Sequence, residues 1–172
     1  MNKFIYIAFS ILLVSCAEDN EPVKPDFEWS KKQSSELNSK FAKQEEIDIN
    51  LYLNMRPEWE MSKTGSGLRY WVYESGDGED LSSGNLAEVE YSVGLLDGTA
   101  CYATASDEYV EVMIDHSEVE TGMQEALKLL KVGDKAKIIV PSHLGHGLLG
   151  DLDQIPPQRT LVIDLTLLGI TK

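Results

Sequence analysis

The chain has 172 residues, enough for one folded domain with an appendage and a sizeable core. Hydrophobic residues make up 42% and charged residues 26%, which are ordinary values for a globular protein in water. The formal net charge is −14 and no lysine- or arginine-rich run is present. Such a surface repels phosphate backbones and anionic lipid surfaces, so we expect no nucleic-acid partner.

The first fifteen residues resemble a bacterial lipoprotein signal peptide. Lys3 supplies a positive start, and residues 4–14 form an apolar run that is too short to span a bilayer. The small residue Ser15 then precedes Cys16, as in a lipobox. The resemblance implies cleavage before Cys16 and acylation of that cysteine, which would anchor the chain in the membrane of the cell envelope. An ordinary signal peptide with a chance cysteine is the alternative.

The next segment, residues 16–26, is polar and acidic and is predicted to be a solvated tether. An acidic cluster directly after a lipidated cysteine resembles the surface-export signal of lipoproteins in Bacteroidetes-type bacteria, although a plain spacer explains it equally well. Once Cys16 is acylated, Cys101 is the only thiol left, so no internal disulfide can form. Cys101 is then a small buried hydrophobe or a free thiol, and burial is the better expectation.

Residues 27–63 form a predicted helical extension. Apolar residues recur at helical spacing in two series, and Arg56-Pro57 ends the helix because the residue before a proline avoids helical geometry. We expect one or two amphipathic helices that pack on the following domain or on a second copy of the chain, giving a homodimer. The first series is Trp29, Leu37, Phe41 and Ile49, with Glu45 on the same face, and the second is Ile47, Leu51 and Met55.

Residues 64–172 are predicted to form one α+β domain. After a glycine-containing break at 64–67, residues 68–73 alternate as in a half-buried strand. A short helix begins at Thr121 or Gly122 and ends near Gly133, where a left-handed residue is favoured. Several strands and one short helix indicate a curved antiparallel sheet wrapped on that helix. The further predicted strands are 86–96, 109–114, 136–140 and 160–170.

Five segments of this domain resemble, in order and spacing, the FK506-binding-protein (FKBP) family of peptidyl-prolyl cis-trans isomerases. They are Leu95-Leu96-Asp97-Gly98, the segment 122–133, the segment 140–147, Ile155-Pro156-Pro157, and the final strand 161–168. The resemblance implies an FKBP-like fold, isomerase activity on proline-containing polypeptide segments, and no cofactor. With the N-terminal signals, it predicts an envelope-anchored enzyme, periplasmic or surface-exposed, that assists the folding of exported proteins.

The resemblance also assigns pocket positions residue by residue. The family's strand tyrosine is kept as Tyr91, and its other catalytic positions are Tyr102, in place of an aspartate, and His146, in place of a tyrosine. The implied substrate-binding residues are Cys101 (phenylalanine in the family), Val119 (kept), Glu120 (isoleucine, acting through its backbone N–H), Met123 (tryptophan), Ile155 (kept) and Ile163 (phenylalanine).

These substitutions predict a cavity that exists but turns over poorly. Met123 keeps an apolar floor yet softens it, and His146 makes one donor sensitive to pH. The carboxylate associated with fast catalysis is absent from position 102. The alternative is a non-catalytic chaperone or binding module on the same fold. A third hypothesis, capture of a nutrient or host ligand at the cell surface, rests only on the acidic cluster after Cys16.

We expect no metal site. His143 and His146 lie three residues apart near Asp151 and Asp153, but glycines on either side of His146 argue against a regular helix there, and no cysteine lies nearby in the sequence.

Overall fold

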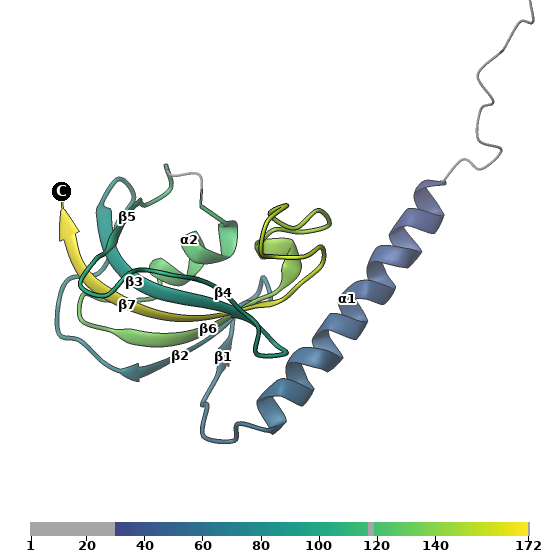
Figure 1. Cartoon of the computed structure of the whole chain (residues 1–172), viewed down its shortest axis with the longest axis horizontal. Helices are drawn as coiled ribbons and strands as arrows, with labels where there is room; N and C mark the ends of the chain where they lie inside the picture. Colours follow the sequence, from purple (N-terminus) through teal and green to yellow (C-terminus); the bar gives the residue numbers. More distant parts are fainter. Residues whose placement is uncertain (1–29, 117–118, 172) are drawn as a thin grey trace, which may run out of the picture.

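The computed structural model of this chain describes residues 30–116 and 119–171. The predicted signal peptide, the lipidation site Cys16, the acidic tether and the first residues of the helical extension therefore lie outside the described residues. The elements run in the following order (Figure 1): α1 (Lys31–Asn54), β1 (Ser62–Lys63), β2 (Arg69–Glu74), β3 (Leu86–Leu95), β4 (Ala100–Ala103), β5 (Val110–Met113), α2 (Thr121–Leu127), β6 (Lys135–Val140), the 3-10 turn η1 (Ser142–Leu144) and β7 (Leu161–Thr171).

Seven strands within the described residues form one antiparallel sheet in the order β1-β2-β6-β7-β3-β4, with β5 also paired to β3. The longest pairing joins β3 to β7, from Leu86 opposite Thr171 to Leu95 opposite Leu161, with a bulge between Glu88 and Val89. The sheet curves around α2 (Figure 1). This confirms the predicted α+β class, a curved antiparallel sheet wrapped on one short helix.

The core lies between the sheet and α2, and it follows from the alternation of each strand. On β7 the side chains of Leu161, Ile163, Leu165 and Leu167 are all buried, as the period of two requires. They pack with Met123, Ala126 and Leu127 of α2 and with the alternate residues of β3 and β6 in one apolar cluster. This alternation of buried and exposed residues is the pattern from which the main strands were correctly predicted.

Two details differ from the sequence prediction. The helix α2 ends at Leu127, because the N–H groups of Leu129 and Leu130 bond to the carbonyls three residues back and tighten the chain into turns. Gly133 does adopt a positive φ of 94°, but it serves the approach to Gly76 on the neighbouring loop and caps no helix. The short strands β1 and β4 were not predicted, and β1 lies within the residues assigned to the helical extension.

The helix α1 is a single helix over the described residues. It begins with a capping box, in which Ser30 and Gln33 bond to each other's backbone N–H groups, and ends just before Arg56-Pro57. Its second half packs on the sheet, where Ile49 and Tyr52 are buried against Ile139 of β6. Neighbouring residues of a strand point to opposite faces, and Ile138 belongs to the core beneath α2, so α1 covers the face opposite α2.

Most other apolar residues of α1 remain uncovered, although Leu53 is half-buried against the same cluster. Side chains 31–44 are exposed, and Figure 1 shows this half of the helix running clear of the sheet. The predicted series at 47, 51 and 55 is exposed as well, with Met55 at 72%. Among the apolar side chains of α1, packing on the domain is thus confirmed for Ile49 and Tyr52, with Leu53 half-buried beside them.

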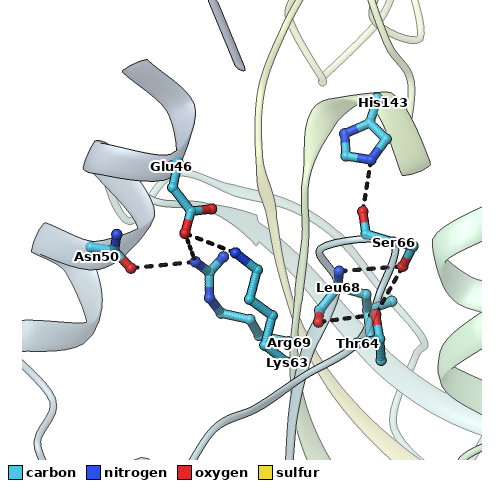
Figure 2. Close-up of polar contacts among 8 residues, drawn as sticks. All are labelled: Glu46, Asn50, Lys63, Thr64, Ser66, Leu68, Arg69 and His143. Carbon is cyan, nitrogen blue, oxygen red and sulfur yellow. Dashed lines mark hydrogen bonds and ion pairs between the residues drawn. The ribbon is translucent and has the colours of Figure 1, made fainter. Parts of the chain in front are cut away.

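Two carboxylates anchor the docked half of α1 to the domain. Glu46 bonds to Arg69 of β2 at 2.7 Å and to Lys63 at 2.9 Å, and Arg69 also donates to Asn50 at 3.3 Å (Figure 2). The guanidinium is buried and its Nη1 has no partner among the described residues, so Glu46 is its main counter-charge. The preceding residue, Glu45, instead binds both ends of the loop between β6 and β7.

Candidate active site

A small cavity opens between the concave face of the sheet and α2. Its volume is about 80 Å³, which suits one ring-sized group more than a drug-sized ligand, whose pockets measure about 300–1,000 Å³. Apart from Tyr91, Tyr102 and Glu120 its walls are apolar. The lining residues are Tyr91 and Val93 of β3, Tyr102 of β4, Val110 and Val112 of β5, Val119, Glu120 and Met123 at the start of α2, Val140, Ile155, and Leu161 and Ile163 of β7.

The structure brings together seven of the nine pocket residues assigned from the sequence. Tyr91, Tyr102, Val119, Glu120, Met123, Ile155 and Ile163 all line this cavity. Cys101 is buried as expected but lies outside the lining, where its thiol donates to the carbonyl of Gln154 at 3.8 Å. Burial raises the pKa of the Cys101 thiol, so the residue is a neutral packing group.

Met123 forms the floor because α2 approaches the sheet closely. It is 5% exposed on the buried side of the helix. Its neighbour Gly122 lies so near β6 that a Cβ atom at this position would be 2.4 Å from Cγ1 of Val140. A side chain at 122 would therefore push α2 and its methionine away from the sheet, so Gly122 sets the depth of the cavity.

Tyr102 makes a polar contact at the cavity wall. Its hydroxyl donates a short hydrogen bond to the carboxylate of Asp151, which also accepts the N–H groups of Asp153 at 2.9 Å and Ile155 at 2.7 Å. Burial alone would raise the pKa of Asp151, but these three hydrogen bonds lower it to about 2. The bond to Asp151, together with burial, raises the pKa of Tyr102 to about 12.

The sequence reasoning missed Asp151. The aspartate absent from position 102 suggested that the pocket has no carboxylate, yet Asp151 brings one to Tyr102 from the β6–β7 loop, residues 141–160. The signal that could have found it is the Asp151-x-Asp153 pattern just before Ile155, which is typical of a side chain that accepts backbone N–H groups of its own turn.

His146 and Glu120 meet beside the cavity. Nε2 of His146 lies 2.7 Å from Oε1 of Glu120. The imidazole would therefore have to break this contact before Nε2 could donate a hydrogen bond to a ligand. His146 is not among the lining residues, whereas Glu120 is. The pair joins the β6–β7 loop to the start of α2, and it becomes an ion pair when the imidazole is protonated.

Two hydrogen-bond donors at the cavity have no partner in the described part of the chain. The hydroxyl of Tyr91 has no partner among the described residues, nor has the backbone N–H of Glu120, the residue that precedes the first turn of α2. Both belong to residues that line the apolar cavity. The site can therefore offer two donors to the carbonyl groups of a bound chain, beside the carboxylates of Glu120 and Asp151.

His143 belongs to a different contact. Its Nε2 lies 3.0 Å from the carbonyl oxygen of Ser66, in the turn between β1 and β2 (Figure 2). Over the residues that the structure describes, no group of three histidine, cysteine or acidic side chains is arranged to hold a metal ion.

A second, larger hollow of about 830 Å³ lies between α1 and the β6–β7 loop. It is a groove with mixed polar and apolar walls, and its apolar residues are largely exposed ones of α1 and the loop. The small cavity has the convergent apolar walls and free donors of a specific site, so we take it as the candidate active site. The apolar lining of the groove comprises Phe41, Ala42, Leu51, Tyr52, Met55, Leu95, Leu96 and Leu148.

Comparison with known proteins gives one consistent result. Residues 78–168 match the family described as FKBP-type peptidyl-prolyl cis-trans isomerase. The FKBP-type isomerase FkpA of Buchnera aphidicola subsp. Schizaphis graminum is 33% identical over 133 residues, which cover 76% of this chain and 52% of that protein. FkpA of Escherichia coli K12 is 36% identical over 110 residues, covering 63% and 40%. The chain thus spans about half the length of the curated relatives that it matches.

Solved structures agree on the fold. The crystal structure of FkpA from Escherichia coli matches with a TM-score of 0.62 and 28% identity, covering 81% of this chain and 67% of that one. A peptidyl-prolyl cis-trans isomerase from Pseudomonas syringae matches with a TM-score of 0.64 at 20% identity, covering 74% and 92%, a likeness of fold alone. The match to the family covers the cavity and leaves α1 outside it.

Proposed function

This chain belongs to the FKBP-type peptidyl-prolyl cis-trans isomerase family, and we propose that its small cavity binds X-Pro segments and accelerates their cis–trans isomerisation. One observation carries the proposal: the lining of an apolar cavity with Met123 at its floor includes Tyr91 and Glu120, whose hydroxyl and backbone N–H bond to no other described residue. The residues in catalytic and substrate-binding roles remain those assigned from the sequence, except that Cys101 and His146 act from outside the lining.

The reaction needs little chemistry from the protein. Rotation about a peptide bond costs about 18–20 kcal/mol because resonance is lost in the twisted amide. The planar amide is more dipolar than the twisted one, so an apolar cavity favours the twisted form relative to water. Donors that hold the flanking carbonyls then select that geometry, and stabilisation of the transition state beyond that of the ground state is what raises the rate.

We expect turnover to be weak, because two polar side chains near the cavity are already engaged. The Tyr102 hydroxyl donates to Asp151, and the His146 imidazole is paired with Glu120. Each must give up its partner before it can bind a substrate carbonyl. Met123 adds a flexible floor where a rigid ring would restrict the bound proline more.

The decisive experiment is NMR exchange spectroscopy on an Ala-Leu-Pro-Phe peptide with the wild-type chain and with Tyr91→Phe. The proposal expects acceleration by the wild-type chain and a loss of about tenfold in Tyr91→Phe, since one donor hydrogen bond is removed from a desolvated site. An exchange rate in the wild-type sample equal to that of the free peptide would refute the enzymatic role.

The second candidate function is a non-catalytic chaperone or binding module. The observation in its favour is the large groove beside α1, whose exposed apolar residues could hold an extended segment of a client protein. This function predicts that the chain shifts the peptide resonances without accelerating isomerisation. It also predicts that the resonances keep their free-peptide positions when Leu51 and Met55 are replaced by serine.

We further propose that the chain is anchored in the bacterial envelope through Cys16 and assists exported proteins there. Its support is the N-terminal sequence: the apolar run, Ser15-Cys16 and the acidic segment that follows. In the described part of the chain no helix has both the length and the apolar character to cross a bilayer. Mass spectrometry of the N-terminal peptide, with Cys16→Ala as the control, tests the anchor, and protease treatment of intact cells tests exposure at the surface.

A homodimer through α1 remains a proposal as well. Its support is the set of apolar residues that α1 leaves exposed: Leu37, Phe41, Ile47, Leu51 and Met55. Sedimentation equilibrium of the wild-type chain and of a Phe41→Ser, Leu51→Ser variant tests it, because a dimer held by this helix should become a monomer in the variant.

A further inference from the structure

We propose that Glu45 of α1 is a positioning residue for the substrate cavity, because its carboxylate joins the two ends of the β6–β7 loop that forms the cavity wall. The inference rests on the proposed function, since it assigns a further residue to the same site. It also makes α1, which lies outside the family match, a working part of the isomerase domain.

The contacts of Glu45 are specific to the base of the loop. Its Oε1 accepts the backbone N–H of Ser142 at 2.7 Å and the hydroxyl of Thr160 at 2.7 Å. Its Oε2 accepts the hydroxyl of Ser142 at 3.0 Å. Ser142 is the second residue of the loop and Thr160 is its last, so one side chain from a distant helix joins the points where the loop leaves β6 and enters β7.

The loop so held carries three residues of the site. Ile155 lines the cavity, Asp151 accepts from Tyr102, and His146 pairs with Glu120. Internal hydrogen bonds make the loop one unit: the N–H of Gln158 donates to the carbonyl of Gly147 at 2.8 Å, and that of Asp151 to the carbonyl of Ile155 at 3.1 Å. A movement at the base is therefore passed to the wall.

The base is held from a second direction as well. His143, in the turn η1, contacts the carbonyl of Ser66 (Figure 2). The hydroxyl of Ser66 donates to the carboxylate of Glu125 in α2 at 2.7 Å. The start of the loop thus lies between α1 on one side and the β1–β2 turn and α2 on the other. Removal of the Glu45 carboxylate leaves the second support in place, so the domain should stay folded while the loop gains freedom.

A looser loop should weaken binding more than it slows the bound complex. In the variant, Ile155 would be mobile in the free protein and would become fixed when the peptide binds. The loss of its conformational entropy would lower the affinity for the peptide. A mere loss of global stability acts differently, since it reduces the number of active molecules and leaves KM unchanged. The split between KM and kcat therefore separates a positioning role from a general structural one.

The test uses the full-length chain and the Ala-Leu-Pro-Phe peptide. Glu45→Ala should raise KM about tenfold with little change in kcat. Glu45→Gln should retain most of the wild-type KM, because the amide oxygen can still accept the bonds now made to Oε1. Asp48→Ala is the matched control. This carboxylate lies one turn further along α1, its only bond to a described residue is to Gln44 of the same helix, and its removal should leave KM unchanged.

A second measurement keeps the inference independent of activity. The N–H of Ile155 donates to Asp151, and its hydrogen exchange should become about tenfold faster in Glu45→Ala but not in Asp48→Ala. Should Glu45→Ala prove too unstable to purify, Thr160→Val removes one bond to the carboxylate and should shift both readouts in the same direction.

Wild-type KM and wild-type exchange at Ile155 in Glu45→Ala would overturn the inference, and so would a loss confined to kcat. If the wild-type chain does not catalyse isomerisation, the proposed function fails, whereas the exchange of the Ile155 N–H still decides whether Glu45 positions the loop.

Discussion

The hydroxyl of Tyr102 donates a hydrogen bond to the carboxylate of Asp151, which lies 49 residues later in the chain. The same carboxylate accepts two backbone N–H groups of its own loop, so it ties the cavity wall on β4 to the β6–β7 loop. At the position where the resemblance to the family implies an aspartate this chain has Tyr102, and Asp151 brings a carboxylate to it from the β6–β7 loop.

This relationship predicts a specific response to acid. The pKa of Asp151 is lowered from its ordinary value of 3.8 to about 2 in the folded chain. A lowered pKa stabilises the fold above pH 3.8, and that contribution is lost as the pH falls toward 2. Tyr102→Phe removes one donor, so the pKa of Asp151 should rise and the loss of stability through this range should become smaller.

An NMR titration of the Asp151 carboxyl group, with urea unfolding at several pH values between about 2 and 6, measures both effects. Asp153→Asn is the control, since the side chain of that residue makes no bond to Tyr102. An unchanged pKa of Asp151 in Tyr102→Phe would show that the hydroxyl does not donate to it in solution.

The anchor between Glu46 and Arg69 should contribute measurably to stability. Glu46→Ala leaves the buried guanidinium with Asn50 as its remaining partner and should lower the free energy of unfolding by about 1–2 kcal/mol, less than for a fully buried pair because Glu46 is partly exposed. The hydrogen bond from Lys63 lowers the pKa of Glu46, burial raises it and Arg69 lowers it again, with a net decrease. This contribution should therefore fade in acid.

Glu36 provides the matched control on the same helix. Its carboxylate lies 4.0 Å from Lys32 and both side chains are exposed, so Glu36→Ala should change the free energy of unfolding by less than about 0.5 kcal/mol. Equal effects of the two substitutions in urea unfolding would mean that the docking of α1 does not depend on the buried arginine.

Gly122 should tolerate no side chain. A Cβ atom there would lie 2.4 Å from Cγ1 of Val140, so Gly122→Ala should displace α2 and destabilise the fold by about 1–3 kcal/mol. Isomerase activity should fall with it because Met123 moves away from the sheet. Gly65→Ala, at a position with no atom within 4 Å, should unfold like the wild type. An alanine at 122 without any change in the urea midpoint would contradict this packing.

Met123 should matter for both stability and function. Truncation to alanine removes a side chain that is only 5% exposed, and should cost about 2–5 kcal/mol as the cavity grows. Leu129→Ala, a truncation of a residue that is 40% exposed, should cost about 1 kcal/mol or less. Calorimetric unfolding of the two variants compares these losses of stability. A loss in Met123→Ala no larger than in Leu129→Ala would contradict the placement of Met123 at the cavity floor.

The sequence was sufficient to predict the main elements of the domain and most of the pocket. Apolar and polar residues alternate along 161–167, and apolar residues at 123, 126 and 127 have helical spacing. Such local patterns indicate a strand or a helix without any knowledge of its tertiary contacts. The resemblance to a known family then assigned the pocket positions, and seven of the nine line the cavity. The short strand β4 was not predicted, because its four residues show no clear alternation of apolar and polar side chains. Its extended conformation depends on pairing with β3.

Only the tertiary structure decided which polar groups meet. Asp151 reaches Tyr102 across 49 residues, and Glu45 reaches Ser142 and Thr160 across 97 and 115. No sequence period relates such pairs, because their contact depends on how strands and loops far apart in the chain are brought together. For the same reason the sequence could show that α1 is amphipathic but not that Ile49 and Tyr52 would be covered while Leu51 and Met55 stay exposed. That outcome depends on the shape of the sheet face against which the helix packs.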